Sequence, residues 1–262
     1  MIENAAGAPA AATQARARRS SGWGERSLAA LAALFGLFLA LPIVTLVARA
    51  VIDGSLARAF ASPVVFDALS LSLVTTAVSL AITVSLGLPL AFVLARRQFR
   101  GKGWLEAIVD LPIVLPPAVA GLALLLVFGR RGLLSAPFFI RSARTGIAGV
   151  DRDLEDAARV DGASERQLFR SVTVPLASPA LAAGLVMTWA RSLGEFGATI
   201  MFAGNVEGRT QTLPLVVYGE FQAGNLDASI AAAAILVIAA FGVLVAVRVF
   251  HWGRVLDARG LA

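Results

Sequence analysis

Apolar runs long enough to cross a lipid bilayer constrain this chain more than any other feature. Residues 28–48 form a run of about 21 residues, roughly 30 Å as a helix, which matches the hydrocarbon core of a bilayer. Comparable runs occupy residues 68–95, 105–128, 180–202 and 228–250. Apolar residues make up 58% of the chain and charged residues 15%, a composition typical of integral membrane proteins. The sequence therefore predicts an all-α integral membrane protein with five clear spans.

The two ends of the chain are predicted to be tails. Residues 1–27 are rich in alanine and contain four arginines, and the apolar run that follows is too long for the core of a signal peptide. We expect a disordered cytoplasmic tail over residues 1–27, a transmembrane domain over residues 28–250 and a cytoplasmic C-terminal tail over residues 251–262.

The distribution of cationic side chains predicts the topology. Residues 96–102 hold four of them and residues 141–170 hold six, whereas residues 49–67 hold two and residues 203–227 hold one. Loops rich in lysine and arginine stay in the cytoplasm. This pattern also explains the basic pI better than nucleic-acid binding does, and it places both termini and the loop at 151–179 in the cytoplasm.

One crossing is missing from this scheme. The chain must return across the membrane near residues 129–145, but the uncharged run at 132–140 would measure only about 14 Å as a helix. Three explanations are open: an internal deletion, a distorted or re-entrant crossing, or an inversion that places the loop at 151–179 outside. The arginine distribution argues against inversion, and a deletion is the preferred interpretation.

The longest charged stretch of the chain lies at 151–179. Acidic residues at its start suit the amide end of a helix over about 154–163, and Gly162 is suited to ending that helix. A second, amphipathic helix is predicted from Glu165 to Val174, and Pro175 and Pro179 are expected to stop it before the next span. Such a polar segment between apolar spans is either a docking surface or simply a solvated helix.

This stretch resembles the EAA loop of bacterial ABC importer permeases. Asp156, Ala157 and Ala158 are followed after three residues by Gly162, and after nine more by the sequence Val-Thr-Val-Pro. The family pattern has Glu, Ala and Ala, then Gly, then Ile-x-Leu-Pro at the same spacing. The resemblance implies a coupling helix that docks on a separate ATPase, with expected contacts at Glu155, Asp156, Ala157, Ala158, Arg159, Asp161 and Gly162.

Ionisable residues within the predicted span at 180–202 are a second candidate site. Arg191 and Glu195 are four residues apart, on one face of a helix, and charges inside a membrane normally face a partner or a water-filled path. They are either an ion pair that fixes packing or a lining or gate for an anion, with Gly194 and Gly197 allowing close helix approach.

Prolines predict a break near the start of the span at 105–128. Pro112, Pro116 and Pro117 each lack a backbone donor and leave carbonyls that need other partners, so this stretch should face the interior of the bundle. Pro116 and Pro117 are either a structural kink or part of the translocation path.

Three further segments sharpen the resemblance. DLPIVLPPAVAG, VFGRRGLL and RSLGEFGATIMFAGN resemble the permease subunits of bacterial molybdate importers, with sulfate/thiosulfate permeases as the nearest relatives. The resemblance implies a multi-pass protein of the bacterial inner membrane that forms a homodimer, works with two ATPase subunits and receives molybdate, tungstate or sulfate from a periplasmic or lipid-anchored binding protein.

Several function classes are excluded by missing motifs. The chain has no cysteine and one histidine, so it offers no disulfide framework and no metal cluster. It contains no GxxxxGK[ST], GxSxG or HExxH pattern. We therefore expect no enzyme and no cofactor in this chain, with ATP and Mg²⁺ bound by the partner ATPase. The rival class is a channel or secondary transporter that needs no ATPase.

Overall fold

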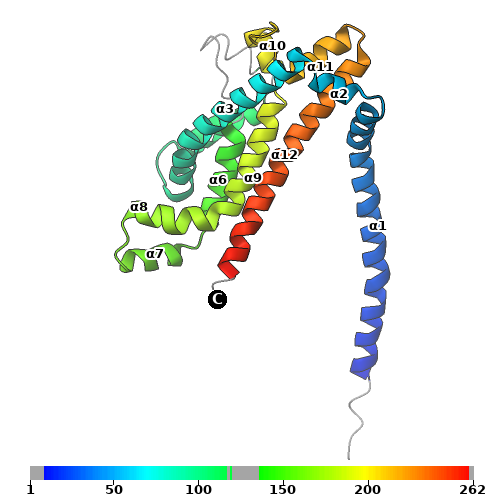
Figure 1. The fold of residues 1–262 in the computed structure, drawn as a ribbon. Coiled ribbons are helices and arrows are strands. Elements are labelled where there is room, and N and C mark those ends of the chain that lie inside the picture. The colour runs from blue at the N-terminus through cyan, green and yellow to red at the C-terminus, as the bar shows by residue number, and fades with distance from the viewer. Residues whose placement is uncertain (1–8, 117–118, 120–135, 260–262) are drawn as a thin grey trace, which may run out of the picture. The chain divides into compact units, whose positions relative to one another are not determined.

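The computed structural model describes residues 9–116, 119 and 136–259, and the regular elements among them are all helices (Figure 1). The chain divides into two compact units, Met1–Arg49 and Ala50–Ala262. Four helical stretches of the described residues are long and apolar enough to cross a membrane. The all-helical membrane architecture predicted from the sequence is confirmed.

The first unit consists of the N-terminal part of α1 (Pro9–Ile52). The apolar stretch Arg26–Ile52 contains the predicted first span. Its large apolar side chains are exposed within this chain, with Leu28 and Phe38 each 67% exposed. The helix begins at Pro9, inside the segment expected to be a disordered tail, whereas residues 1–8 lie outside the described residues.

Three long helices dominate the second unit: α3 (Pro63–Arg96), α9 (Val174–Leu193) and α12 (Leu226–Arg259). Their apolar stretches overlap the predicted second, fifth and last spans, although the fifth covers Glu165–Leu193 rather than residues 180–202. The last helix runs on to Arg259 and therefore includes most of the segment expected to be a C-terminal tail.

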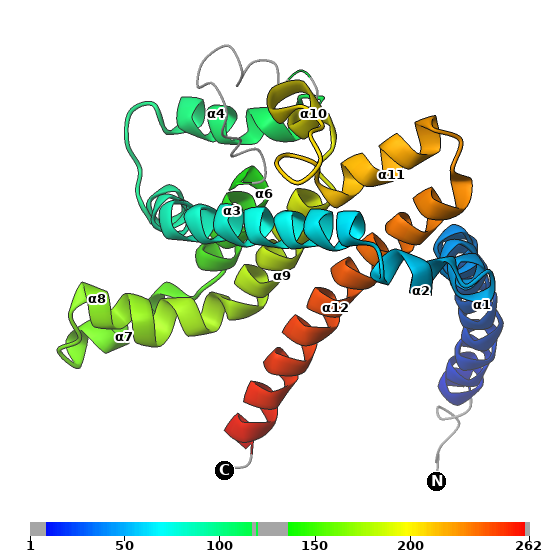
Figure 2. The same cartoon turned by 45° about the horizontal axis from the view of Figure 1, so that its top comes forward.

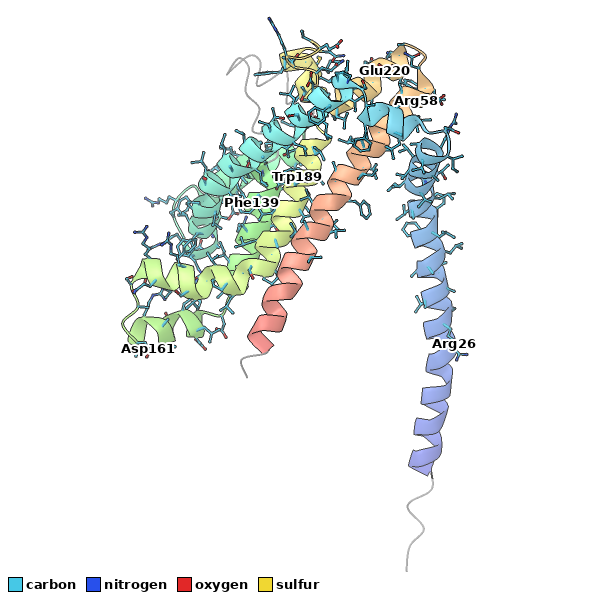
Figure 3. All side chains as sticks on the ribbon, viewed as in Figure 1. Arg26, Arg58, Phe139, Asp161, Trp189 and Glu220 are labelled. Carbon is cyan, nitrogen blue, oxygen red and sulfur yellow. The ribbon has the colours of Figure 1, made fainter. Side chains whose placement is uncertain are left out.

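A shorter helix, α6 (Ala136–Ala148), packs against both α3 and α9. Phe139, labelled in Figure 3, is 1% exposed and lies against Gly87 of α3 and Gly184 of α9. The three helices can approach closely because these positions lack a Cβ: one at Gly87 would lie 2.9 Å from Ile140, and one at Gly184 would lie 2.8 Å from Ser142. The Ser142 hydroxyl also donates to the carbonyl of Ala180 at 2.7 Å.

The segment expected to lack a full crossing contains α6. Its 13 residues measure about 20 Å, against about 30 Å for the hydrocarbon core. Residues 120–135, which include the proposed deletion point, lie outside the described residues. The described part of this crossing is therefore a short helix held between two long ones.

The direction of α6 excludes an inverted half. Phe139 and Ile140 lie near Gly87, while Val150 accepts a hydrogen bond from Arg96, so α6 runs parallel to α3. It runs antiparallel to α9, because Gly146 lies at Ala180 and Ser142 at Gly184. The loop after α6 thus lies at the same end of the bundle as the basic segment after α3, and inversion is contradicted.

Of the predicted third span, only residues 105–116 and 119 lie within the described residues. Helix α4 (Lys102–Val114) ends before Pro116, as the prolines predicted, although Pro112 lies inside it. The helix has no fully buried residue within this single chain, so the described part of this stretch is not enclosed by the chain's own bundle. Leu105 and Val109 pack against the core formed by α3, α6 and α9. Glu106 forms an ion pair with Arg144 of α6 at 3.2 Å, so α4 lies against the side of α6.

The predicted stop at Pro175 and Pro179 is wrong. Helix α8 (Glu165–Leu168), the π-helical turn η1 (Phe169–Thr173) and α9 form one helical stretch of 29 residues. The wider π turn ends directly before Val174 and Pro175, which relieves the clash that a proline ring makes with the preceding turn. The helix then ends at Leu193, earlier than predicted.

A second core lies at the opposite end of the bundle from α7 and α8 (Figure 2). It joins α2 (Ser55–Phe60), the start of α3, α11 (Leu213–Gln222) and α12. The buried Ser72 hydroxyl accepts a hydrogen bond from the Leu213 amide at 2.8 Å, which fixes α11 against α3. The segment at 203–227, predicted only as a polar exterior loop, thus contains a packed helix.

Candidate functional site

The charged stretch forms a short helix with well-defined ends. Helix α7 (Arg152–Val160) starts at Asp151, whose side chain accepts a hydrogen bond from the Asp153 amide at 3.0 Å. It ends at Val160, and two residues further on Gly162 has a φ of 88°, in the left-handed region that favours glycine and turns the chain away from the helix. The Ala163 amide then donates to the Ala158 carbonyl at 3.0 Å. The predicted helix and its glycine stop are confirmed.

The next helix begins at once, with Ser164 as its cap. The Ser164 amide donates to the Gln167 side chain at 2.9 Å, and the Ser164 side chain accepts from the Gln167 amide, forming a capping box. This leaves a turn of only a few residues between α7 and α8. The two helices consequently lie side by side at one end of the bundle (Figure 1).

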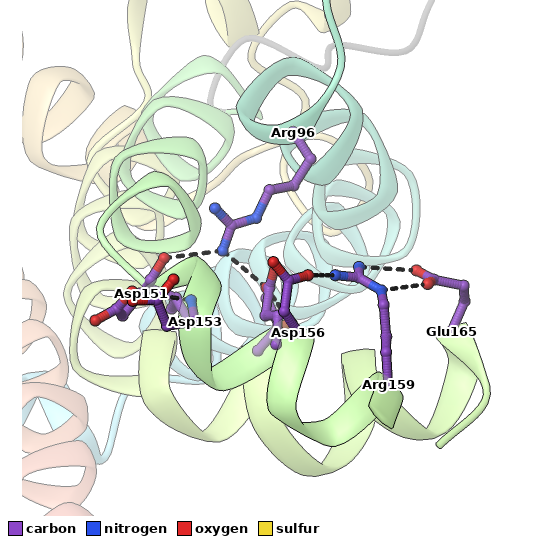
Figure 4. A network of polar contacts seen from close by, with 9 residues as sticks. Arg96, Asp151, Asp153, Asp156, Arg159 and Glu165 are labelled. Carbon is purple, nitrogen blue, oxygen red and sulfur yellow. Dashed lines mark hydrogen bonds and ion pairs between the residues drawn. The ribbon is translucent and has the colours of Figure 1, made fainter. Parts of the chain in front are cut away.

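Arg159 ties the two helices together on their exposed side (Figure 4). Its guanidinium contacts Asp156 at 2.6 Å and Glu165 at 2.7 Å. These two hydrogen-bonded carboxylates, Glu165 first, raise the pKa of Arg159 above its ordinary value. Exposed ion pairs contribute little free energy of folding. We therefore interpret the contacts of Arg159 with Asp156 and Glu165 as orienting α7 on α8 rather than as stabilising the fold.

The two faces of α7 differ sharply. Leu154 is 51% exposed and Val160 is 87% exposed, and the small exposed side chain of Ala157 lies between them on the helix surface. We call Leu154, Ala157 and Val160 the exposed face of α7. Asp156 and Asp161, at its edges, are also exposed, whereas Ala158 is half-buried. An apolar face bordered by charge is what a docking helix presents.

Glu155 lies on the opposite face and is only 3% exposed. One of its oxygens accepts from Arg96 and from Thr173, each at 2.7 Å. The residue predicted as a contact for a partner therefore already has its partners inside the chain. The sequence did not predict the roles of Arg96 and Thr173. Helix geometry offered one signal for the burial of Glu155: positions 155 and 157 are about 200° apart around a helix, so the two residues cannot both face a docked partner.

The structure brings together the two charged residues of the second candidate site. Arg191 and Glu195 form an ion pair at 3.2 Å, with their side chains 36% and 19% exposed. Glu195 lies beyond the end of α9, however, because the helix stops at Leu193. Its other oxygen accepts from the Ala198 amide at 2.8 Å, at the start of α10 (Gly197–Ala203). The pair therefore bridges a helix break rather than lining one continuous span.

The remaining candidates lie on different elements. Gly194 caps α9 and Gly197 begins α10, so both belong to the break that Arg191 and Glu195 bridge. Pro116 is exposed just beyond α4, and Pro117 lies outside the described residues.

Apolar helices of bilayer length, with a short exposed helix at one end, define a multi-pass integral membrane protein. A protein family described as the binding-protein-dependent transport system inner membrane component matches residues 87–254. The chain belongs to this family. The matched residues include α7, α8 and the pair at Arg191 and Glu195.

Curated relatives of similar length share about a third of their residues with this chain. The molybdate/tungstate transport system permease protein WtpB of Pyrococcus abyssi is 36% identical over 233 residues, covering 84% of this chain and 92% of the relative. The molybdenum transport system permease protein ModB of Escherichia coli K12 is 35% identical over 200 residues, covering 66% and 87%.

Solved structures share the fold. A bacterial ABC transporter involved in the import of the acidic polysaccharide alginate matches with a TM-score of 0.68 and 17% identity, covering 92% of this chain and 98% of that one. The MetNI methionine ABC transporter, in inward-facing conformations, matches with a TM-score of 0.54 and 22% identity, covering 74% and 93%. The likeness shows that the described helices adopt the fold of an ABC importer permease.

Proposed function

We propose that this chain is the permease subunit of an ATP-driven importer of molybdate or tungstate. The observation that carries the proposal is the exposed face of α7, an apolar surface on a short helix at one end of the bundle. The names of the curated relatives, which transport molybdate or tungstate, support this cargo. Sulfate or thiosulfate is the alternative cargo, because its permeases resemble this chain as well.

In this proposal α7 docks on a separate ATPase subunit that binds ATP and Mg²⁺. Arg96 and Arg97 lie at the end of α3 near α7, and Arg144 lies in the second half of α6. By the positive-inside rule these cations support a cytoplasmic position for this end of the bundle, and the arginine counts along the sequence support the same position for both termini. ATP binding would draw two permease copies together through their α7 helices. The spans would then switch between inward-open and outward-open states as rigid bodies.

The large apolar surfaces of the spans support an assembly of two permeases in lipid. Phe35 of α1 is 62% exposed, Phe66 of α3 is 64% exposed and Phe241 of α12 is 56% exposed within the single chain. Such side chains in a membrane protein face lipid or another subunit. A binding protein on the opposite side would deliver the oxyanion.

The Arg191 and Glu195 pair is the proposed gate of the oxyanion route. A half-exposed guanidinium at the outer end of α9 offers a charge-assisted donor to a doubly charged oxyanion. Glu195 would neutralise that cation when no anion is present. Gly194 and Gly197 leave the backbone around the pair free to move, because a break separates the two helices there.

The test is uptake into proteoliposomes that contain the permease, its ATPase subunit and the oxyanion-binding protein. We expect molybdate uptake to require ATP, to be competed by tungstate and to be competed poorly by sulfate. Uptake that continues without ATP under an ion gradient would favour the channel or secondary transporter. Stronger competition by sulfate than by tungstate would change the proposed cargo.

A further inference from the structure

A buried polar cluster joins α7 to two of the long helices. Arg96 donates from Nη2 to Glu155 Oε1 at 2.7 Å and to the Val150 carbonyl at 3.1 Å. The Thr173 hydroxyl donates to the same Glu155 oxygen at 2.7 Å. Figure 4 shows Arg96 reaching down from α3 to the start of α7. We refer to Arg96, Glu155 and Thr173 as the buried cluster.

The cluster is almost completely shielded from water. The side chains of Arg96 and Glu155 are 9% and 4% exposed, and Thr173 is fully buried. Removing two charges from water is costly, and a buried ion pair often contributes no more stability than apolar side chains of the same size. The Nε of Arg96 even has no hydrogen-bond partner among the described residues. Stability alone therefore accounts poorly for the pair.

What the cluster does provide is a fixed position for α7. Arg96 is the last residue of α3, and Thr173 is the last residue of the π turn that leads into α9. A second contact joins the same two elements, because the rings of Phe92 and Phe169 meet edge to face at 5.1 Å. Helix α7 is thus joined to α3 and α9 at one point, on the face opposite to its exposed face.

We propose that Arg96, Glu155 and Thr173 form the rigid link that transmits movement of α7 to α3 and α9. The inference rests on the proposed function, in which an ATPase moves α7. Glu155 lies only two residues, about half a helical turn, from Ala157. A movement of the exposed face of α7 would therefore move Glu155 and, through its hydrogen bonds, both α3 and α9. All three are positioning residues, because none belongs to the exposed face of α7.

The test measures the oxyanion moved per ATP hydrolysed in proteoliposomes that contain the complete transporter. In Glu155→Gln the exposed face of α7 is unchanged, so the ATPase subunit should still copurify and hydrolyse ATP. The ratio should fall about tenfold, because Arg96 loses its charged partner. A matched Glu106→Gln variant breaks the ion pair between α4 and α6 and should leave the ratio unchanged.

Two further variants guard against misfolding and distinguish a linked unit from independent residues. Thr173→Val keeps the ion pair and should lower the ratio about threefold, and it decides the question if Glu155→Gln does not fold. The double variant Arg96→Gln with Glu155→Gln should lose no more than either single variant, because residues of one unit are not additive.

The possible failures are distinguishable. An unchanged ratio in Thr173→Val or Glu155→Gln, with the ATPase retained, would overturn the link and leave the proposed function standing. Multiplicative losses in the double variant would also overturn it. An unmodified permease that retains no ATPase subunit would overturn both the proposed function and the link.

Discussion

Replacing Ala157 by arginine is expected to abolish ATP-dependent uptake while leaving the permease folded. Ala157 lies at the centre of the exposed face of α7, between Leu154 and Val160. A docked ATPase would bury the new guanidinium without a partner, which costs about 3 kcal/mol, or roughly 100-fold in affinity. The measurement is the amount of ATPase subunit that copurifies with tagged permease, followed by uptake in proteoliposomes.

The matched control is Ala223→Arg, the same change at an exposed alanine that caps α11 at the other end of the bundle. The ATPase subunit should copurify with this variant in normal amounts. If Ala157→Arg retained as much ATPase as the control does, the exposed face of α7 would not be the docking surface.

Replacing Gly146 by leucine is expected to break the packing of α6 on α9. A Cβ at this position would collide with the Cβ of Ala180, and the Ala177 carbonyl lies 3.4 Å away. Because these atoms belong to short side chains and backbone, they cannot rotate aside. Overpacking of this kind costs about 1–3 kcal/mol, equivalent to roughly 3–10 °C in unfolding temperature for a chain of this size.

Thermal unfolding of the detergent-purified permease measures this effect. Gly103→Leu is the control, because Gly103 is an exposed helical glycine with nothing within 4 Å of a Cβ. Equal unfolding temperatures for the two variants would mean that α6 does not depend on its close approach to α9. The short crossing would then be held by some other contact.

Local signals in the sequence were enough to predict α7. Acidic residues such as Asp153 and Glu155 favour the first turn of a helix, and Gly162 favours a stop. These preferences act over a few residues without help from the rest of the chain, although the helix begins at Arg152, two residues before the predicted start. The long spans were equally accessible, because a bilayer demands apolar runs of a fixed length.

Signals that depend on distant residues were not accessible. Pro175 normally ends a helix, but here the preceding π turn and the packing of α9 on α6 keep the helix continuous. The burial of Glu155 depends on Arg96, which is 59 positions away in the sequence. A single sequence therefore indicates that Glu155 is charged and near a docking motif, but not that it faces the bundle.

The same limit applies to the ion pair in the fifth span. Spacing predicted that Arg191 and Glu195 meet, and they do, at 3.2 Å. The helix break between them could not be predicted, because a glycine such as Gly194 within an apolar run is equally compatible with close packing of continuous helices. The geometry shows that Glu195 bonds the Ala198 amide instead of continuing α9.

The most direct test of the account uses the absence of native cysteine. A single cysteine in place of Val160, which is 87% exposed on α7, is treated with a bulky, membrane-impermeant maleimide. We predict labelling only from the cytoplasmic side of permease without ATPase, and protection once the ATPase subunit is bound. Labelling from the outside, or equal labelling with and without the ATPase, would contradict the assignment of α7 as the docking helix.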